Sequence, residues 1–527
     1  MSTLQPVTAV AAELGLTADQ YDVHGTYRAK IHLGLVADRP PRRGKYVLVT
    51  ATTPTSSGIG KTVTAIGLAM GLSRLGRRSA VAVRESALGP TLGAKGGGAG
   101  GGAAQIVPLD DCLLDLGDTA AVGAATNLLA AVVDDRLHRG LGIDPGSVTW
   151  RRVLDVDDRS LRQVIVGLGG RANGPPRETG FDITAASEVM ALLALSRDRA
   201  DLRARLDALV PAWDSQGKPV TAGQLRAAGA MAVLLRRALQ PNLLQTSEGT
   251  PALVHTGPFG NLSLGSSSVL ADLFALPRVD FLVTEAGFGA DLGAEKFFHL
   301  KCSASGEYPD VAVLVTTVPN LREQGGTANL RHHLAILHAF HVPVVVAVNC
   351  FPGDAAKELA LIKAASLDAG AAAVAEHHAF ARGGDGCLEL AEAVASHTTS
   401  LEPGPRALYA PTDSAQQKVH LLATKVYGAA GVAWDRSALQ ALERYVEAGY
   451  GQLPVCIAKT HLSLSHDPAL RGAPTGFTLP VREVRLAAGA GYLTVLTGAI
   501  ATMPGLPTHP RLLDLDVDPD GAAVGLT

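Results

Sequence analysis

Cysteine is scarce in this sequence, and its few copies follow no pattern. The chain of 527 residues holds five, at Cys112, Cys302, Cys350, Cys387 and Cys456. The intervals between them do not match those of metal-binding cysteines. An odd number of cysteines, scattered along a large chain, also argues against a framework of disulfide bonds. We therefore expect a reducing compartment, the cytoplasm.

Strong net charge and long apolar runs are also missing. The formal net charge is −3 and no basic run stands out, so nothing favours nucleic acid as a partner. Three tryptophans and eleven phenylalanines are too sparse for a surface that stacks bases. We see no apolar run long enough for a membrane span and no signal peptide. With 47% hydrophobic and 18% charged residues, we expect a compact enzyme of roughly two to four domains, with no nucleic-acid or membrane partner.

Glycine, by contrast, is abundant, and the chain is organised around one glycine-bearing stretch, KYVLVTATTPTSSGIGKTVT at 45–64. The apolar run from Tyr46 to Thr50 predicts a buried parallel strand, and the segment after the loop predicts a helix that stops at Gly76. A strand, a glycine loop and a helix N-terminus together make an anion site. Lys61 adds a full charge, and Thr62 offers a hydroxyl to a Mg²⁺ on the phosphates.

We therefore predict phosphate binding by this loop. The alternative is an ordinary strand-to-helix turn, because Thr55 stands where a strict P-loop has its first glycine. The predicted nucleotide-binding residues are Thr53, Pro54, Thr55, Ser56, Ser57, Gly58, Ile59, Gly60, Lys61 and Thr62.

Further candidates follow the next predicted strand, SAVAVRES. It ends at Arg84 and Glu85, at the edge where open α/β sheets bind their ligands. A glycine tract from Gly96 to Gly102 follows, preceded by Lys95. We favour a loop around an anionic substrate, with Lys95, Gly96 and Gly97 as contacts, over a flexible linker. Asp118, after Gly117, is either a site residue or a plain turn or N-cap aspartate.

The rest of the chain alternates between helical and strand-like segments. We expect a helical lead-in over 1–44, an acidic strand over 111–118, and helices over 150–240 interrupted by a long polar loop with Arg171, Arg177 and Glu178. From 241 onward, apolar runs before glycine-bearing turns predict parallel strands. The pairs His332-His333 and His377-His378 lack partners at ligand spacing, so we expect no metal there.

The chain resembles the formate–tetrahydrofolate ligase family over nearly its whole length. The matching stretches are TPT..G.GKT at 53–62, RE..LGP..G.KGG.AGGG at 84–102, NLLAA at 127–131, VGLGG.ANG.PRETGFDIT.ASE at 166–188, PNL.QT.EGTPAL at 241–253, TEAGFGADLGAEKFF at 284–298, N.FP.D at 349–354, AKT..SLS.DP at 458–468 and TMPGLP at 502–507. The resemblance implies an α/β fold, with a P-loop-type, mostly parallel sheet covered by helices on both faces and smaller α/β domains beside it.

The resemblance also implies the chemistry and the roles of residues. Formate attacks the γ-phosphate of ATP to give formyl phosphate, and tetrahydrofolate then takes the formyl group, giving 10-formyltetrahydrofolate, ADP and phosphate. Lys61 and Thr62 would hold phosphate and Mg²⁺, and Arg84 would steady formyl phosphate. Asp118 would orient a substrate or transfer a proton. The pterin ring would stack between Phe351 and Phe380, the latter standing where the family usually has tryptophan.

Several family residues are replaced in this chain. Ile59 stands for a glutamate, and Asp115 and Ala120 stand where the family has histidines. The remaining replacements change the side chains around the acyl and acceptor site and leave fewer polar groups there: Ala103, Leu264, Ser266, Ser267, Leu462, His466 and Ala499. Two alternatives therefore stay open, a paralogue that ligates another small carboxylate or amine, and a nucleotide-binding homologue with little ligase activity.

The resemblance finally implies a homo-oligomer, a tetramer, that works on small-molecule substrates, and leaves open whether a monovalent cation is needed besides ATP with Mg²⁺. We divide the chain into a phosphate-loop part at 1–145, a helical and α/β part at 146–320, a return to the main sheet at 321–400 and a C-terminal α/β domain at 401–527.

Overall fold

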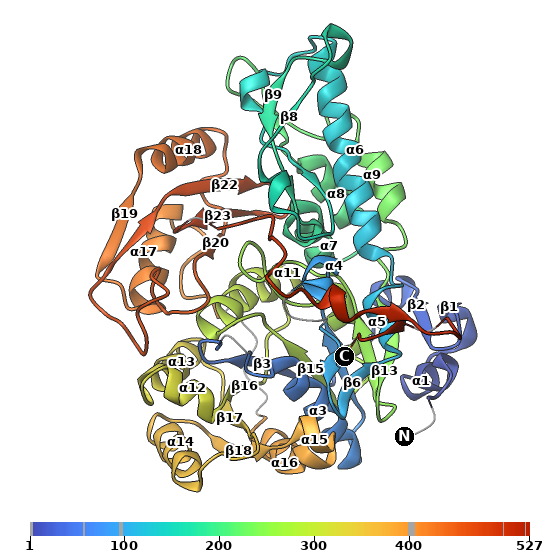
Figure 1. The fold of residues 1–527 in the computed structure, drawn as a ribbon, viewed down its shortest axis with the longest axis vertical. Coiled ribbons are helices and arrows are strands. Elements are labelled where there is room, and N and C mark those ends of the chain that lie inside the picture. Colours follow the sequence, from blue (N-terminus) through green and yellow to red (C-terminus); the bar gives the residue numbers. More distant parts are fainter. Residues whose placement is uncertain are drawn as a thin grey trace.

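A large central sheet organises the computed structural model, which describes residues 4–55, 58–93, 98–398, 406–498, 500–521 and 523–526. Its strand order is β1-β2-β13-β14-β4-β15-β3-β16-β17-β18 (Figure 1). From β14 to β18 every neighbouring pair is parallel, whereas β1, β2 and β13 pair antiparallel. The bounds are Tyr21–His24 (β1), Arg28–Ile31 (β2), Lys45–Ala51 (β3), Ser79–Val83 (β4), Asn242–Thr246 (β13), Pro251–Val254 (β14), Phe281–Glu285 (β15), Val311–Thr316 (β16), Val344–Asn349 (β17) and Ala373–His377 (β18). The predicted mostly parallel sheet is confirmed.

Helices cover both faces of this sheet. Alternate residues of a strand pack into two separate hydrophobic cores, one on each face. Val47 and Val49 of β3 belong to the core under α3 (Lys61–Arg74) and α16 (Leu388–His397). Leu48, between them, belongs to the other core, with residues of α10 (Val269–Ala275) and α13 (Ala328–Ala339). Because side chains alternate across a strand, a strand buried on both faces is apolar throughout, which is why these runs could be read from the sequence.

The structure differs from the prediction in the lead-in over 1–44 and in the segment at 111–118. The lead-in over 1–44 is only partly helical: α1 (Val7–Glu13) is followed by the β1–β2 hairpin, whose second strand pairs with β13. The acidic segment at 111–118 is not a strand, because α5 (Leu109–Leu113) occupies its start. Pro108 before that helix, and Asp110 and Asp111 in its first turn, are helix-start signals that outweigh the short apolar run.

An upper lobe rises from the sheet and consists of residues 118–240 (Figure 1). It contains the long helix α6 (Asp118–His138), the helices α7 (Glu188–Leu195), α8 (Arg199–Ala208) and α9 (Ala228–Leu235), and a ribbon of β8 (Val164–Val166) and β9 (Arg177–Thr179). The expectation of helices interrupted by one long loop is therefore wrong in part, because that loop contributes β9 and β10 (Phe181–Asp182), which pairs with β7 (Arg152–Val153).

One helical stretch in the described part of the chain corrects the expectation about apolar runs. Leu109–His138 is long and apolar enough, by length and composition alone, to cross a membrane, and half of its most apolar window is buried inside the protein. A core helix passes the same test.

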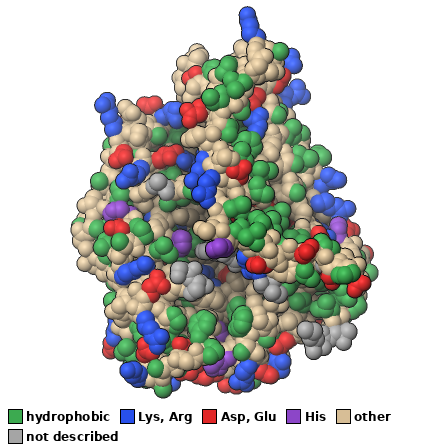
Figure 2. Space-filling model, viewed as in Figure 1, with side chains coloured by type: hydrophobic (Ala, Val, Ile, Leu, Met, Phe, Trp, Pro, Cys, Tyr) green, Lys and Arg blue, Asp and Glu red, His purple; other side chains and the backbone are tan. Residues whose placement is uncertain are grey.

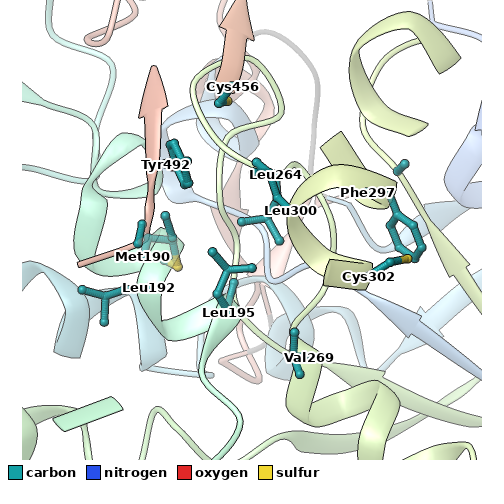
Figure 3. Packing of buried hydrophobic residues seen from close by; sticks show 14 of the residues in the cluster. Met190, Leu192, Leu195, Leu264, Val269, Phe297, Leu300, Cys302, Cys456 and Tyr492 are labelled. Carbon is teal, nitrogen blue, oxygen red and sulfur yellow. The ribbon is translucent and has the colours of Figure 1, made fainter. Parts of the chain in front are cut away.

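A left-hand lobe follows at 406–498 (Figure 1), with α17 (Ala415–Lys425), α18 (Arg436–Glu447) and the sheet β20-β23-β22. Their bounds are Val455–Ala458 (β20), Glu483–Ala487 (β22) and Tyr492–Leu496 (β23). Distant parts of the chain meet in the larger core, among them Met190, Leu264, Phe297 and Tyr492 (Figure 3). The predicted domain boundaries at 145, 320 and 400 stay a prediction.

Candidate active site

The loop after β3 turns sharply into α3, and glycine is required at that turn. Gly60, at the N-cap of α3, has φ 81°, and a Cβ there would collide with the side-chain amide of Asn349. That amide donates to the carbonyl oxygen of Ile59 at 3.0 Å. Lys61 and Thr62 thus begin α3, where backbone N–H groups and the helix dipole favour an anion.

Thr53, earlier in the loop, is held from several directions. Its carbonyl oxygen accepts a hydrogen bond from Asn320 at 2.6 Å, and its N–H donates to the Asn329 side chain at 3.2 Å. His333, whose pKa burial lowers to about 3, lies 3.1 Å from the Thr53 hydroxyl. The loop is therefore anchored before it reaches α3. Ser56 and Ser57 lie outside the described residues.

Neighbouring strands bring further polar side chains to the same edge. β4 and β15 are adjacent, and β15 also pairs with β3. Thr62 donates its hydroxyl hydrogen to Glu285, at the end of β15, at 2.8 Å. Arg84, just after β4, lies 4.0 Å from the other Glu285 oxygen. The Arg84 Nε–H is buried without a hydrogen-bond partner among the described residues, so this edge holds a donor ready for an anionic oxygen.

A buried charged cluster lies beside Arg84. The Lys30 ammonium, from the hairpin strand β2, contacts both oxygens of Asp118 at 2.6 and 2.7 Å, and Asn242 donates to Asp118 at 2.8 Å. Thr119 donates its N–H and hydroxyl hydrogens to Glu85 at 3.1 and 2.9 Å. Five residues from four separate stretches of the chain thus form two hydrogen-bonded sets, which the neighbours Asp118 and Thr119 join.

Burial sets the protonation of this cluster. It raises the pKa of Glu85 to about 8, with the neighbouring Asp118 adding to the rise. Burial also raises the pKa of Asp118, but the Lys30 ammonium, 2.6 Å away, opposes that rise. We assign the negative charge at neutral pH to Asp118, because Lys30 touches it directly, and leave Glu85 protonated.

The two predicted stacking residues follow the carboxyl ends of neighbouring strands, Phe351 in a loop and Phe380 in the short helix α15 (Ala379–Arg382). Phe351 follows β17 and is 45% exposed, and Phe380 follows β18 and is 62% exposed. Large exposed aromatics at a ligand edge fit a stacking platform better than a core. Phe380 also rests on the glycine tract, since a Cβ on Gly101 would lie 3.2 Å from its ring.

The glycine tract is folded, not a loose linker, as far as it is described. Gly100 and Gly101 form β5 and pair with β6 (Ala104–Val107), and Gly100 has φ 89°. Lys95, Gly96 and Gly97 lie outside the described residues. In the described part of the chain, no group of three or more His, Cys, Asp or Glu side chains could hold a metal.

Comparisons with known proteins show the family of the chain. A family model described as formate–tetrahydrofolate ligase matches residues 1–527. A formate–tetrahydrofolate ligase of Roseiflexus sp. (strain RS-1) is 52% identical over 99% of this chain and 98% of its own length. Those of Chloroflexus aurantiacus (strain ATCC 29366 / DSM 635 / J-10-fl) and Saccharopolyspora erythraea are each 49% identical, over 99% and 100% of this chain and 98% of their own lengths.

The chain belongs to the formate–tetrahydrofolate ligase family. Among the residues at which it departs from the family pattern, Ile59 and Leu264 are buried in the cores, and Ser267 donates to the carbonyl oxygen of His255 at 3.4 Å. Asp115 and Ala120 are exposed. Ala499 lies outside the described residues.

Sequence reasoning missed two residues of this candidate site. Glu285 closes an apolar strand, and an acidic residue at a strand end is a signal that could have found it. Lys30 carried no local signal, because it lies in a segment expected to be helical. Only its contact with Asp118, across 88 positions of sequence, reveals it.

Proposed function

We propose that the protein ligates formate to tetrahydrofolate at the expense of ATP, giving 10-formyltetrahydrofolate, ADP and phosphate through formyl phosphate. Family membership over the whole chain supports this activity. The observation that carries the site assignment is the shared edge of β3, β4 and β15, to which Lys61, Arg84 and Glu285 belong. Positive charge gathered there is what phosphoryl transfer requires.

In the first step a formate oxygen attacks the γ-phosphorus of ATP. The new P–O bond forms as the bond to the ADP oxygen breaks, and negative charge spreads over the transferring group. Lys61 at the start of α3 and the backbone N–H groups there stabilise that charge. Arg84 donates its partnerless Nε–H to an oxygen of formyl phosphate.

In the second step N10 of tetrahydrofolate attacks the formyl carbon, the bond from that carbon to the phosphate oxygen breaks, and phosphate leaves with one oxygen from formate and takes up the amine proton. Both Asp118 oxygens are already engaged by Lys30 and Asn242, so we assign Asp118 an orienting role, not that of the base. Phe351 and Phe380 hold the pterin ring by stacking. Lys95, Gly96 and Gly97 are proposed as further substrate contacts.

Mg²⁺ is implied by the family, and the residues present fit it. Mg²⁺ prefers oxygen ligands and takes few from the protein when phosphates supply the rest. The Thr62 hydroxyl and the Glu285 carboxylate, 2.8 Å apart at the phosphate loop, are suitable donors. When bound, the ion would neutralise phosphate charge.

The proposal is tested with oxygen-18-labelled formate. We expect ADP release to require both formate and tetrahydrofolate, and one labelled oxygen to reach inorganic phosphate in each turnover. Arg84→Gln should lower kcat on the order of 10². The control Arg77→Ala, at an exposed site after α3, should not. Unlabelled phosphate would rule out formyl phosphate, and faster turnover with acetate than with formate would favour the paralogue that uses another carboxylate.

We also propose that the protein is a homo-oligomer, a tetramer, and that it works in the cytoplasm. Its partners are then the small-molecule substrates, with neither nucleic acid nor membrane.

A further inference from the structure

A second cavity lies between the upper lobe and the left-hand lobe, apart from the site described above. Its volume is about 500 Å³, within the range of small-molecule sites. Its walls come from α6, the starts of β7 and α7, and, across the gap, α18, β22 and β23. Neither the phosphate-loop residues nor Arg84, Asp118, Phe351 or Phe380 line it. Figure 1 shows β22 of the left-hand lobe directed toward the upper lobe, and Figure 2 shows that this face of the molecule is hollowed near its centre.

Four aromatic side chains line the cavity: Trp150, Trp213, Tyr445 and Tyr492. Trp213 and Tyr445 face each other across the two lobes, with ring centres 6.0 Å apart and planes 24° apart. Trp150 and Tyr492 also line the cavity, and both are almost completely buried. Such rings suit a flat, apolar ligand body.

The charged groups of the wall leave one cation unpaired. Arg151 pairs with Asp182 at 3.2 Å, and Arg485 with Glu483 at 2.6 Å. Arg444 lies over the Trp213 ring at 4.6 Å, and no carboxylate pairs with it in the described part of the chain. Its Nε is buried and has no hydrogen-bond partner among the residues that the structure describes. An unpaired guanidinium on a ring face at a cavity is suited to a planar anion, most directly a carboxylate.

A third carboxyl group of the wall, that of Glu188, repels such an anion only weakly. Glu188 accepts hydrogen bonds from the N–H groups of Gly489 and Ala490 at 2.7 and 3.2 Å. Burial raises its pKa to about 7, so at neutral pH the group is charged only in part. At neutral pH the side chains that line the cavity therefore carry more positive than negative charge.

We propose that this cavity binds a small aromatic carboxylate, its ring against Trp213 and Tyr445 and its carboxylate on Arg444. The chemistry is shared by a free aromatic acid and by the benzoylglutamate part of a folate, and competition separates the two sources. Because the walls belong to two lobes, the ligand would hold the lobes together.

The test titrates the full chain with benzoate, following calorimetry and tryptophan fluorescence, since two of the three tryptophans line the cavity. We expect saturable binding that acetate, which lacks the ring, does not reproduce. Arg444→Met should weaken benzoate at least about tenfold, as loss of a charge-assisted hydrogen bond does. Arg436→Met, an exposed position on the same helix, should change nothing.

A second variant guards against a misfolded Arg444→Met protein. Ala441→Phe fills the cavity from α18 while every charge remains, and it should abolish benzoate binding. If tetrahydrofolate displaces benzoate, the natural ligand is the benzoylglutamate part of a folate. If it does not, the natural ligand is a separate aromatic acid. No saturable binding, equal binding of acetate, or unchanged affinity in both variants would overturn the site. Since ligase turnover is not the readout, this outcome is independent of the proposed ligase function.

Discussion

The charge on Asp118 depends on Lys30, which reaches it from a different strand. Lys30→Met removes the ammonium and leaves a buried carboxylate whose remaining side-chain hydrogen bond, among the described residues, comes from Asn242. Removing one partner of a buried pair costs about 3–5 kcal/mol, so we expect the free energy of unfolding to fall by that amount. Ligase turnover should fall as well, because Asp118 loses its orientation. Urea unfolding and steady-state rates measure the two effects.

The double variant Lys30→Met with Asp118→Asn separates stability from catalysis. It removes both charges, so most of the lost stability should return while the rate stays low. If Lys30→Met alone keeps a normal kcat, Lys30 does not position Asp118 for the reaction.

Lys61 is the charge expected at the transferring phosphoryl group. Lys61→Ala should lower kcat on the order of 10² or more, as loss of one stabilising group in a transition state does. Its place at the first turn of α3, partly exposed, predicts little change in stability. Rates and thermal unfolding are compared with those of Arg77→Ala. Turnover close to that of the unaltered protein would remove Lys61 from the phosphate site.

At the scale of elements, the β5–β6 hairpin explains the glycine tract. Gly100 has a positive φ, and a Cβ there would collide with the carbonyl oxygen of Ala104 and crowd Ile66. Gly100→Val should therefore destabilise the protein by about 3 kcal/mol, from left-handed strain and overpacking together. If the glycine tract were only a loop around a substrate, Gly100→Val would abolish activity with little loss of stability. The hairpin adds the expected loss of stability. Thermal and urea unfolding provide the measurement.

Gly76→Ala is the matched control, since it has φ 75° at the end of α3 and no atom within 4 Å of an added Cβ. It should cost only about 1 kcal/mol. Equal losses in the two variants would mean that the close approach at Gly100 is unimportant.

At the scale of the whole molecule, buried titratable groups set the pH dependence of stability. Burial raises the pKa of Glu85 to about 8, of Glu188 to about 7 and of Asp155 to about 6. Each holds a proton in the folded chain that the unfolded chain has released, so each lowers stability as pH rises from about 4 to its folded pKa. Buried His255, His333 and His377, with pKa values of about 3, act oppositely and add stability as pH rises to about 6.5.

The two sets nearly cancel between pH 4 and 6, and above pH 6.5 only the acids remain. We therefore expect the free energy of unfolding to peak on the acid side of neutrality and to fall toward pH 8, by about 1.4 kcal/mol per pH unit for each group still titrating. Urea unfolding at pH 5, 6, 7 and 8 measures this, and Glu85→Gln should remove much of the decline between pH 7 and 8. A stability that rises over that interval would contradict the assignment.

The sequence by itself determined the parallel strands, the helix after the phosphate loop, and Lys61, Arg84 and Asp118 as candidates. These features depend on local patterns: runs such as Val311–Thr316 are apolar because both faces of the sheet are covered, and Gly60 precedes α3 because the turn needs a positive φ.

Only the tertiary structure decided which distant groups meet. Strand order places Glu285 beside Thr62, and the pairing of β2 with β13 carries Lys30 to Asp118. Neither contact leaves a trace in local sequence, because each arises from elements far apart in the chain that a shared sheet brings together. For the same reason the cavity between the lobes could not be predicted from the sequence. Its two stacked rings, Trp213 and Tyr445, come from segments more than two hundred residues apart.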